Sequence, residues 1–428
     1  MKTSPSRGIV HVPRRFVAEE WGGTETVILE IARRQQQAGE RPTIVTSMAL
    51  ARRREETIGG VPVRRFPHTY PFLCLSAADR AAMDRKGGNL LSLSLFKSLL
   101  TQPDVRLFHA HALKRLGGEV RTAARWRRKP LVVSLHGGVF DVPEAEREQM
   151  MQPIANKPEW GRMFGAFFGS RRVLEDADRV LCVGQSEFEQ ARRQLGHDRV
   201  AYLPNGVDCA RFATGDGASF RSRHGIPSDA FVVLNLSRLD AQKNQMLLLE
   251  AFVRFKERQP SAFLVLIGPE TQPEYAARLR TFIAEHGLAG SVRLLPGLRA
   301  DDPDLVHAYH ACDVFVLPSR HEPFGIVVLE AWSAGRPVVV NHIGGLKALV
   351  RHGETGLFIR AGGDGTPAVL AAQLTFLAGA PGLRRELGEA GRAEARAHYD
   401  WSRIAGRLEE QYQAAEASAA RRYGRLAA

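Results

Sequence analysis

The chain has 428 residues, of which 44% are hydrophobic and 25% charged, so it has the composition of a globular protein and enough length for two domains. No apolar run approaches the roughly 20 residues that cross a bilayer, which excludes a membrane-spanning helix. Residues 1–7 lead directly into a predicted strand without a signal-peptide core. We therefore expect a cytoplasmic protein.

The formal net charge of +13 is unevenly distributed along the chain. Residues 1–208 carry 33 basic and 23 acidic side chains, whereas residues 209–428 carry 26 and 23. This bias fits peripheral contact with an anionic membrane or an anionic acceptor, and a solvated arginine-rich surface would produce it as well. We expect no nucleic-acid partner, because the sequence has no basic motif interleaved with aromatic residues and no zinc-finger spacing.

The four cysteines are Cys74, Cys182, Cys209 and Cys312, and none of them has Cys-x-x-Cys spacing. Cys182 and Cys312 lie in or beside apolar segments. We interpret the cysteines as core thiols rather than as disulfides or zinc ligands.

The first half of the chain begins with a short predicted strand at residues 9–12, followed by a turn that contains Gly22 and Gly23. Apolar residues then keep helical spacing over residues 24–38. Glycines at a strand-to-helix turn let the backbone approach a ligand closely, and the start of a helix favours phosphate. A Gly-Gly turn is common, however, and the chain has no G-x-G-x-x-G dinucleotide fingerprint.

Strand and helix patterns alternate through the rest of the first half, which predicts a doubly wound parallel sheet. The predicted strands are 43–46, 61–66, 105–109, 131–135, 180–183 and 200–203, and the predicted helices are 89–100, 113–126, 161–175 and 186–195. His109, His111 and His136 fall at the carboxyl ends of such strands, where ligands gather. A histidine at this position is as often a structural hydrogen-bonding group as a catalytic one.

Residues 137–168 form an unusually long connection, with acidic residues first and apolar residues afterwards. The apolar members are Met150, Met151, Trp160, Met163, Phe164, Phe167 and Phe168. A connection of about thirty residues exceeds ordinary loop lengths, which favours a cap on the acceptor side or an interfacial segment. The alternative is that its apolar part is the packed face of a helix.

A Pro/Asn/Gly turn at residues 203–208 and the small, polar residues of 211–229 predict a hinge. A second series of alternating elements follows, with strands at 231–236, 262–267, 292–295, 314–317, 337–340 and 357–359, and helices at 244–258, 273–286, 302–311, 325–334, 367–378 and 383–397. We therefore predict one domain over residues 1–208, a second over 209–398, and a carboxyl-terminal segment over 399–428.

Two cations follow the first strand of the second half. Arg238 and Lys243 bracket a loop that opens a helix, so both can converge with the helix start on a pyrophosphate. An isolated pair of this kind would by default be solvated. Further along, Pro296 and Gly297 follow another strand end and predict a turn.

Residues 319–335 lie between two short apolar runs and predict a strand, a loop and a helix that ends at Gly335, followed by a second strand. Glu322 falls in the loop, and Glu330 falls about two turns later on the helix. Free backbone N–H groups therefore lie between two carboxylates, which suits a ligand with a phosphate and vicinal hydroxyls, such as a nucleotide sugar. Taken alone, a carboxylate near a helix start often only caps the helix.

This stretch as a whole resembles the donor-binding segment of the retaining glycosyltransferases of family 4. The likeness covers the Pro-Ser before it, the Phe-Gly after Glu322 and the Glu-Ala-x-x-x-Gly at its end, and it extends to the Arg-x4-Lys pair, the Gly-Gly loop and residues 134–138. It implies an α/β protein of the GT-B fold, with two doubly wound Rossmann-like domains facing each other across a cleft. Residues 399–428 would return to the amino-terminal domain as a helix.

The resemblance also implies roles for individual residues. It places His136 beside the transferred sugar, Glu322 on sugar hydroxyls and Glu330 on the ribose. The implied catalytic residues are His136, Arg238, Lys243 and Glu322, and the implied donor-binding residues are Gly22, Gly23, Arg238, Lys243, Gly297, Glu322, Pro323, Phe324, Gly325, Ile326 and Glu330. One segment, residues 344–348, departs from the family pattern because Ala348 stands where a glutamate is usual.

The implied activity is the retaining transfer of a hexose-type sugar from a nucleotide diphosphate sugar to a saccharide or lipid-linked acceptor, with the leaving phosphate accepting the proton of the acceptor. We expect no cofactor beyond this co-substrate. We also expect no catalytic metal, because no Asp-x-Asp-type pair or His/Asp cluster stands at a site position. A non-hydrolysing sugar-nucleotide epimerase and a non-catalytic sugar-nucleotide-binding subunit remain open as alternatives.

Overall fold

The computed structural model describes residues 8–18, 21–85, 87–137, 151–155, 157–360 and 365–424. They form two compact units, one ending at Pro204 and resumed from Ile404, and the other comprising Asn205–Arg403. The domain boundaries expected from the sequence, at 208/209 and 398/399, stay a prediction. The acidic part of the predicted connection, residues 138–150, lies outside the described residues.

The first unit is built on an eight-stranded sheet with the order β3-β4-β2-β1-β5-β6-β7-β8. The strands are β1 (Gly8–Val12), β2 (Arg41–Ser47), β3 (Glu55–Ile58), β4 (Val61–Phe66), β5 (Val105–Ala110), β6 (Leu131–Leu135), β7 (Arg179–Cys182) and β8 (Val200–Tyr202). All neighbouring pairs are parallel except β3 with β4. The helices are α1 (Gly23–Gln37), α2 (Ala77–Arg85), α3 (Leu93–Thr101), α4 (Lys114–Trp126), α6 (Arg162–Phe167), α7 (Val173–Asp176), α8 (Gln185–Leu195) and most of α18 (Trp401–Gly424).

The second unit has a six-stranded, wholly parallel sheet with the order β11-β10-β9-β12-β13-β14. The strands are β9 (Val232–Leu236), β10 (Phe263–Ile267), β11 (Val292–Leu295), β12 (Val314–Leu317), β13 (Val338–Val340) and β14 (Leu357–Phe358). The helices are α9 (Cys209–Phe212), α10 (Gly217–Arg223), α11 (Gln245–Arg258), α12 (Pro273–Glu285), α13 (Pro303–Ala311), α14 (Ile326–Ser333), α15 (Leu346–Leu349), α16 (Pro367–Gly379) and α17 (Pro381–Glu394). A π-helical turn, Ala395–Tyr399, continues α17.

Alternate residues of the central strands pack on opposite faces of the second sheet. Val232 and Leu234 of β9 belong to one hydrophobic cluster, and Val233 belongs to another that includes α11 and α16. Helices therefore cover both faces of the sheet, which explains why its strands are continuous apolar runs in the sequence. The predicted fold class, an α/β protein with two doubly wound Rossmann-like domains, is confirmed.

The structure corrects the predicted helix at residues 161–175, which is two short helices, α6 and α7. Gly169 adopts φ +60°, and a Cβ there would lie 2.5 Å from Nη1 of Arg121. The carbonyl of Phe168 accepts hydrogen bonds from Arg121 and Thr122 of α4. These tertiary contacts replace the helical ladder, and periodicity alone does not reveal them. Strand β3 and helix α2 were also absent from the sequence-based prediction.

Among the described residues, no helix combines the length and the apolar content needed to cross a membrane. Cys182, Cys209 and Cys312 are buried free thiols, whereas Cys74 is free and exposed, so the expectation of core thiols is wrong for Cys74.

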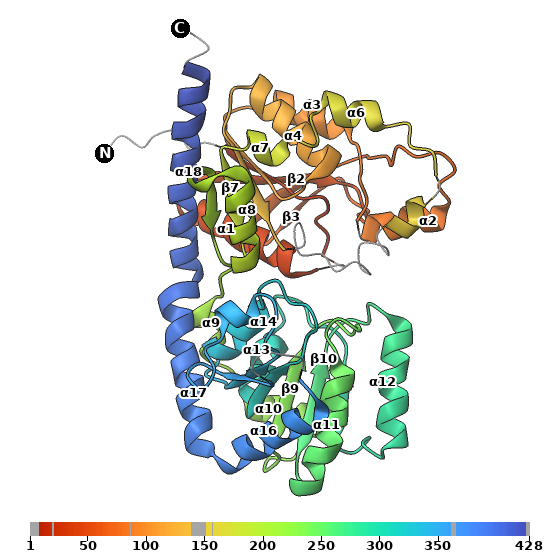
Figure 1. Cartoon of the computed structure of the whole chain (residues 1–428), viewed down its shortest axis with the longest axis vertical. Coiled ribbons are helices and arrows are strands. Elements are labelled where there is room, and N and C mark those ends of the chain that lie inside the picture. The colour runs from red at the N-terminus through yellow and green to blue at the C-terminus, as the bar shows by residue number, and fades with distance from the viewer. Residues whose placement is uncertain are drawn as a thin grey trace. The chain divides into compact units, whose positions relative to one another are not determined.

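The long blue helix labelled α18 in Figure 1 belongs for most of its length to the first unit. A buried guanidinium holds it there. The Arg106 side chain, on β5 and only 7% exposed, donates to both carboxylate oxygens of Glu409 at 2.7 and 3.0 Å and to both of Glu416 at 3.0 and 3.1 Å. It also donates to Glu40 at 2.9 Å. Removing this cation would leave three carboxylates facing one another.

We predict that Arg106→Met lowers the free energy of unfolding of the first unit by about 3 kcal/mol, because breaking a buried ion network leaves uncompensated charge. Urea denaturation followed by circular dichroism measures the change. The control is Arg33→Met, whose exposed side chain pairs with Glu30 on the same helix and should cost less than about 0.5 kcal/mol. Equal losses in the two variants would contradict the prediction.

Candidate functional site

The predicted site residues of the second unit gather at one edge of its sheet. Strands β9, β10, β11 and β12 are parallel neighbours, so the loops that follow them leave from the same edge. These loops carry Arg238 and Lys243 after β9, Gly297 after β11 and Glu322 after β12. This edge is where ligands of open α/β sheets bind.

The loops after β9 and β12 are joined by three contacts. The Lys243 ammonium lies 2.6 Å from a carboxylate oxygen of Glu322, and the two side chains are 13% and 11% exposed. The Arg320 amide donates to the Gln242 carbonyl at 2.8 Å, and the Gln242 side chain donates to the His321 carbonyl at 3.2 Å. The structure thus brings together two of the predicted residues that lie 79 positions apart.

Arg238 lies beside this pair but is more exposed, at 45% of its side chain. Its guanidinium is 3.2 Å from Asp240, whose buried carboxylate also accepts from the Lys243 backbone amide at 3.0 Å. Asp240 therefore shapes the loop that carries both cations. Sequence reasoning missed Asp240 and Gln242 as site residues, although an aspartate in the loop before a helix is an ordinary turn signal.

Two glycines on a third loop are required by close packing against residues 322–324. A Cβ at Gly344 would lie 2.4 Å from the Glu322 carbonyl oxygen, and one at Gly345 would lie 2.1 Å from the Pro323 carbonyl oxygen. The Gly345 amide donates to the Glu322 carbonyl at 2.8 Å. Gly344 and Gly345 thus pack against the backbone of the Glu322 loop, a contact that the sequence did not reveal.

The residues after Glu322 form the start of α14. Gly325 is its N-cap with φ +99°, and Ile326 is its first residue. Phe324 is buried in the core, so only its backbone is offered to a ligand. Gly297 packs against Pro269, where a Cβ would lie 2.7 Å from the proline ring. The donor-binding roles expected for these residues and for Pro323 stay a prediction.

Glu330 lies on α14 and accepts a hydrogen bond of 2.6 Å from the Tyr309 hydroxyl. Burial raises the pKa of Glu330 to about 7, and the bond from Tyr309 opposes this increase. Its carboxyl group therefore titrates near neutral pH.

In the first unit, Gly22 is the N-cap of α1 and Gly23 its first residue, which gives an uncapped helix start at the predicted turn. A Cβ at Gly22 would lie 3.1 Å from a carboxylate oxygen of Glu25. Burial raises the pKa of Glu25, with Arg15 opposing the effect. These glycines and the residues of the second unit lie in separate units.

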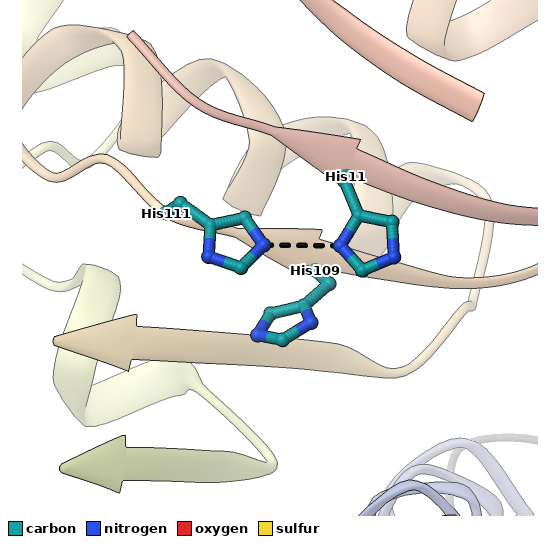
Figure 2. Close-up of side chains that lie close together, drawn as sticks. All are labelled: His11, His109 and His111. Atoms are coloured by element: carbon teal, nitrogen blue, oxygen red, sulfur yellow. Dashed lines mark hydrogen bonds between the residues drawn. The ribbon is translucent and has the colours of Figure 1, made fainter. Parts of the chain in front are cut away.

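The three predicted histidines of the first unit, His109, His111 and His136, belong to a cluster with His11 of β1. Figure 2 shows three of the four: His11, His109 and His111. His11 Nδ1 lies 3.0 Å from His111 Nε2, and His111 Nδ1 lies 2.9 Å from His136 Nε2. Burial lowers the pKa of His11 and of His136 to about 4, and those of His109 and His111 well below the usual value. All four imidazoles are therefore neutral at physiological pH.

Three of these histidines, His11, His109 and His111, have ring nitrogens within 4.8 Å of one another, close enough to share a metal ion. Each of their ring nitrogens already faces a hydrogen-bonding partner. Neutral imidazoles are also the form in which histidine binds metals. The positions of these nitrogens therefore fit a hydrogen-bonded histidine network as well as a three-histidine metal site.

Two family models match the chain. Residues 21–211 match the family described as Glycosyltransferase Family 4, and residues 217–394 match the family described as Glycosyl transferases group 1.

Similar proteins include enzymes named D-inositol 3-phosphate glycosyltransferase. The one from Catenulispora acidiphila is 31% identical over 410 residues, covering 92% of this chain and 91% of that protein. The one from Acidothermus cellulolyticus is 35% identical over 308 residues, covering 69% of this chain and 64% of that protein. The matches to the latter relative and to the one from Geodermatophilus obscurus thus span just under two thirds of those proteins' lengths.

Among solved structures, HepE of Anabaena in complex with UDP and glucose matches with a TM-score of 0.70 and 21% identity, covering 95% of this chain and 99% of that one. WaaG, a glycosyltransferase involved in lipopolysaccharide biosynthesis, matches with a TM-score of 0.64 and 16% identity, covering 93% and 98%. At these identities the structural likeness concerns the fold.

The raised pKa of Glu330 predicts a pH-dependent loss of stability. An unfolded glutamate has a pKa of about 4.3, so the folded state prefers the protonated carboxyl, and its contribution is full below that pH and is lost as the pH rises through about 7. Glu330→Gln removes this titration. As the pH is raised from 5 to 8, the free energy of unfolding of the variant should rise by about 1–3 kcal/mol relative to that of the wild type.

Thermal or urea unfolding at several pH values measures this difference. Glu274→Gln, a substitution at an exposed position on α12, is the control and should keep a constant offset from the wild type. A constant offset for Glu330→Gln as well would contradict the assignment.

Proposed function

The chain belongs to glycosyltransferase family 4, and we propose that it transfers a hexose-type sugar from a nucleotide diphosphate sugar to a phosphate-bearing acceptor with retention of configuration. The observation that carries this proposal is the ion pair between two neighbouring loops. The Lys243 ammonium lies 2.6 Å from a carboxylate oxygen of Glu322, and Arg238 lies on the same loop as Lys243. The pair offers a cation for a diphosphate and a carboxylate for hydroxyls at one point. Neither alternative, an epimerase or a non-catalytic subunit, has a specific observation in its favour.

The ion pair has a direct role in this proposal. Before the donor binds, Glu322 holds the Lys243 ammonium, so the lysine is positioned without an unpaired charge. A diphosphate that reaches Lys243 competes for the ammonium, and the carboxylate becomes available to accept hydrogen bonds from sugar hydroxyls. Donor binding thus exchanges one set of charge-assisted hydrogen bonds for another.

The proposed transfer breaks the bond between the anomeric carbon and the leaving phosphate oxygen, and it forms the bond to the acceptor oxygen on the same face. The leaving phosphate oxygen takes the proton of the acceptor hydroxyl, and a nucleoside diphosphate departs. Negative charge grows on that diphosphate, so Arg238 and Lys243 contribute most in the transition state. Glu330 would bind the ribose, and Gly22 and Gly23 the phosphates.

The donor and acceptor classes are drawn from two observations. The HepE structure contains UDP and glucose, which supports testing uridine diphosphate sugars first. The relatives are named for D-inositol 3-phosphate, and the first half of this chain carries the excess positive charge, which fits an anionic acceptor. A lipid-linked saccharide phosphate shares this chemistry, and separate assays with the two acceptors distinguish them.

A second proposal concerns the surface of the first unit. The side chains of Trp126, Met163 and Phe167 on α4 and α6 are 59%, 71% and 63% exposed. The rings of Trp126 and Phe167 lie 6.3 Å apart, and Met163 stands one helical turn before Phe167. For Met163 and Phe167, which belong to the predicted 137–168 connection, the packed-face interpretation of the sequence is wrong. Because the adjacent residues 125–129 are strongly basic, we propose that this surface contacts an anionic membrane.

Substitutions in the donor site should separate by role. We predict that Arg238→Ala and Lys243→Ala each lower kcat by about 10²-fold, because each removes a cation facing the leaving diphosphate. Glu330→Ala should chiefly raise the donor KM, and Glu322→Ala should impair both parameters. His136→Ala tests the assignment with the least support, and unchanged kcat would make His136 structural.

Steady-state assays of donor and acceptor dependence measure these effects. Arg299→Ala is the control, because its exposed guanidinium pairs only with Asp301 among the contacts of the described residues. Near-full turnover in both Arg238→Ala and Lys243→Ala would contradict the proposed donor site. Product formed without any acceptor would instead favour the epimerase.

The membrane proposal is tested by liposome co-sedimentation. We expect binding to rise with the content of anionic lipid and to fall with salt. Met163→Ser combined with Phe167→Ser should weaken binding by about tenfold, whereas Phe376→Ser, at a 59% exposed position of the second unit, should not change it. Binding that ignores both lipid charge and the double substitution would leave only a solvated basic surface.

A further inference from the structure

The histidine cluster is part of a longer hydrogen-bonded chain that begins at the Gln35 amide. The Gln35 side chain on α1 donates from its Nε2 to the Tyr412 hydroxyl of α18 at 3.0 Å. Its Oε1 therefore faces His11 Nε2, at 2.8 Å. A carbonyl oxygen can only accept, so His11 carries its proton on Nε2.

This orientation propagates because each neutral imidazole has one donor and one acceptor nitrogen. With its proton on Nε2, His11 accepts at Nδ1 from His111 Nε2 at 3.0 Å. His111 in turn accepts at Nδ1 from His136 Nε2 at 2.9 Å. His136 is thus left with its proton on Nε2 and a lone pair on Nδ1, which makes no hydrogen bond to the residues that the structure describes.

A side branch of the chain is consistent with the same assignment. The Tyr412 hydroxyl, having accepted from Gln35, donates to His109 Nδ1 at 2.8 Å. His109 then donates from Nε2 to the Ser134 hydroxyl at 2.7 Å. Every nitrogen of His11, His109 and His111 is therefore used once, as a donor or as an acceptor, without conflict. Figure 2 shows how closely these three rings lie.

From this arrangement we infer that Gln35, His11 and His111 are positioning residues that hold His136 as a neutral imidazole with Nδ1 as a hydrogen-bond acceptor for a sugar hydroxyl. The inference rests on the proposed function for the identity of the ligand, but not for the state of the imidazole. A nitrogen with a lone pair can accept a hydrogen bond from a hydroxyl. It cannot form one with an ionised phosphate oxygen, which also can only accept. His136 would therefore orient the sugar and would bind no anion.

The tautomer of His136 can be measured directly by long-range ¹H–¹⁵N NMR on the full chain labelled at histidine, with His136→Asn to assign the signal. The expected result is an Nε2-protonated His136 in the wild type. Gln35→Met removes the anchoring acceptor and should give a mixture of both tautomers. Gln35→Glu keeps an acceptor toward His11 and should retain the wild-type pattern.

Ser134→Ala is the control, because it cuts the side branch at His109 and leaves the path from Gln35 to His136 intact. It should not alter the His136 signals. An Nδ1-protonated His136 in the wild type, or an unchanged pattern in Gln35→Met, overturns the inference. Stoichiometric metal in the purified protein, with His11 and His111 signals that change on chelation, also overturns it.

A kinetic readout complements the spectrum. If the lone pair serves a sugar hydroxyl, Gln35→Met should lower kcat/KM by about threefold or more, and Gln35→Glu should restore it to within about twofold. A correct tautomer with equal kcat/KM in the three proteins would overturn the role on the sugar. Absence of transfer with every donor and acceptor would instead count against the proposed function, while the NMR result would still decide the tautomer.

Discussion

The ion pair between Lys243 and Glu322 is the contact on which the donor-site proposal most depends. Two loops that follow neighbouring parallel strands are held together by this pair and by the backbone and side chain of Gln242. Because both side chains are largely shielded from water, the pair loses little to solvent screening. The same shielding makes each charge costly when its partner is removed.

The two units are linked to function through different physical means. The second unit presents charge: cations, a carboxylate of raised pKa and the start of α14. The first unit presents neutral imidazoles in a hydrogen-bonded chain that reaches α18, from which we infer their proton positions. Tyr412 belongs to α18, and Arg106 binds Glu409 of the same helix, so α18 also contributes to the histidine cluster of the first unit.

Every strand except β3 could be predicted, because buried parallel strands are continuous apolar runs, as at residues 314–317. Strand β3 is antiparallel and has no buried residue, so it lacks this pattern. The break in the helix at Gly169 could not, because the competing contacts come from Arg121 and Thr122, which are distant in sequence. In the site, Glu322 and Lys243 were predicted from the family resemblance, whereas their mutual contact was not. The exposure of Met163 and Phe167 also contradicts the packed helix face that was one of the two interpretations of residues 137–168.

The sequence by itself determined the α/β class, the strand ends that carry the charged loops and the family, because these depend on local periodicity and short motifs. Only the tertiary structure decided which groups meet: Lys243 with Glu322, Glu330 with Tyr309, and Gln35 with His11. Ionisation and tautomer are set by burial and by hydrogen-bond partners from distant positions in the chain. These quantities therefore have no local signature in the sequence.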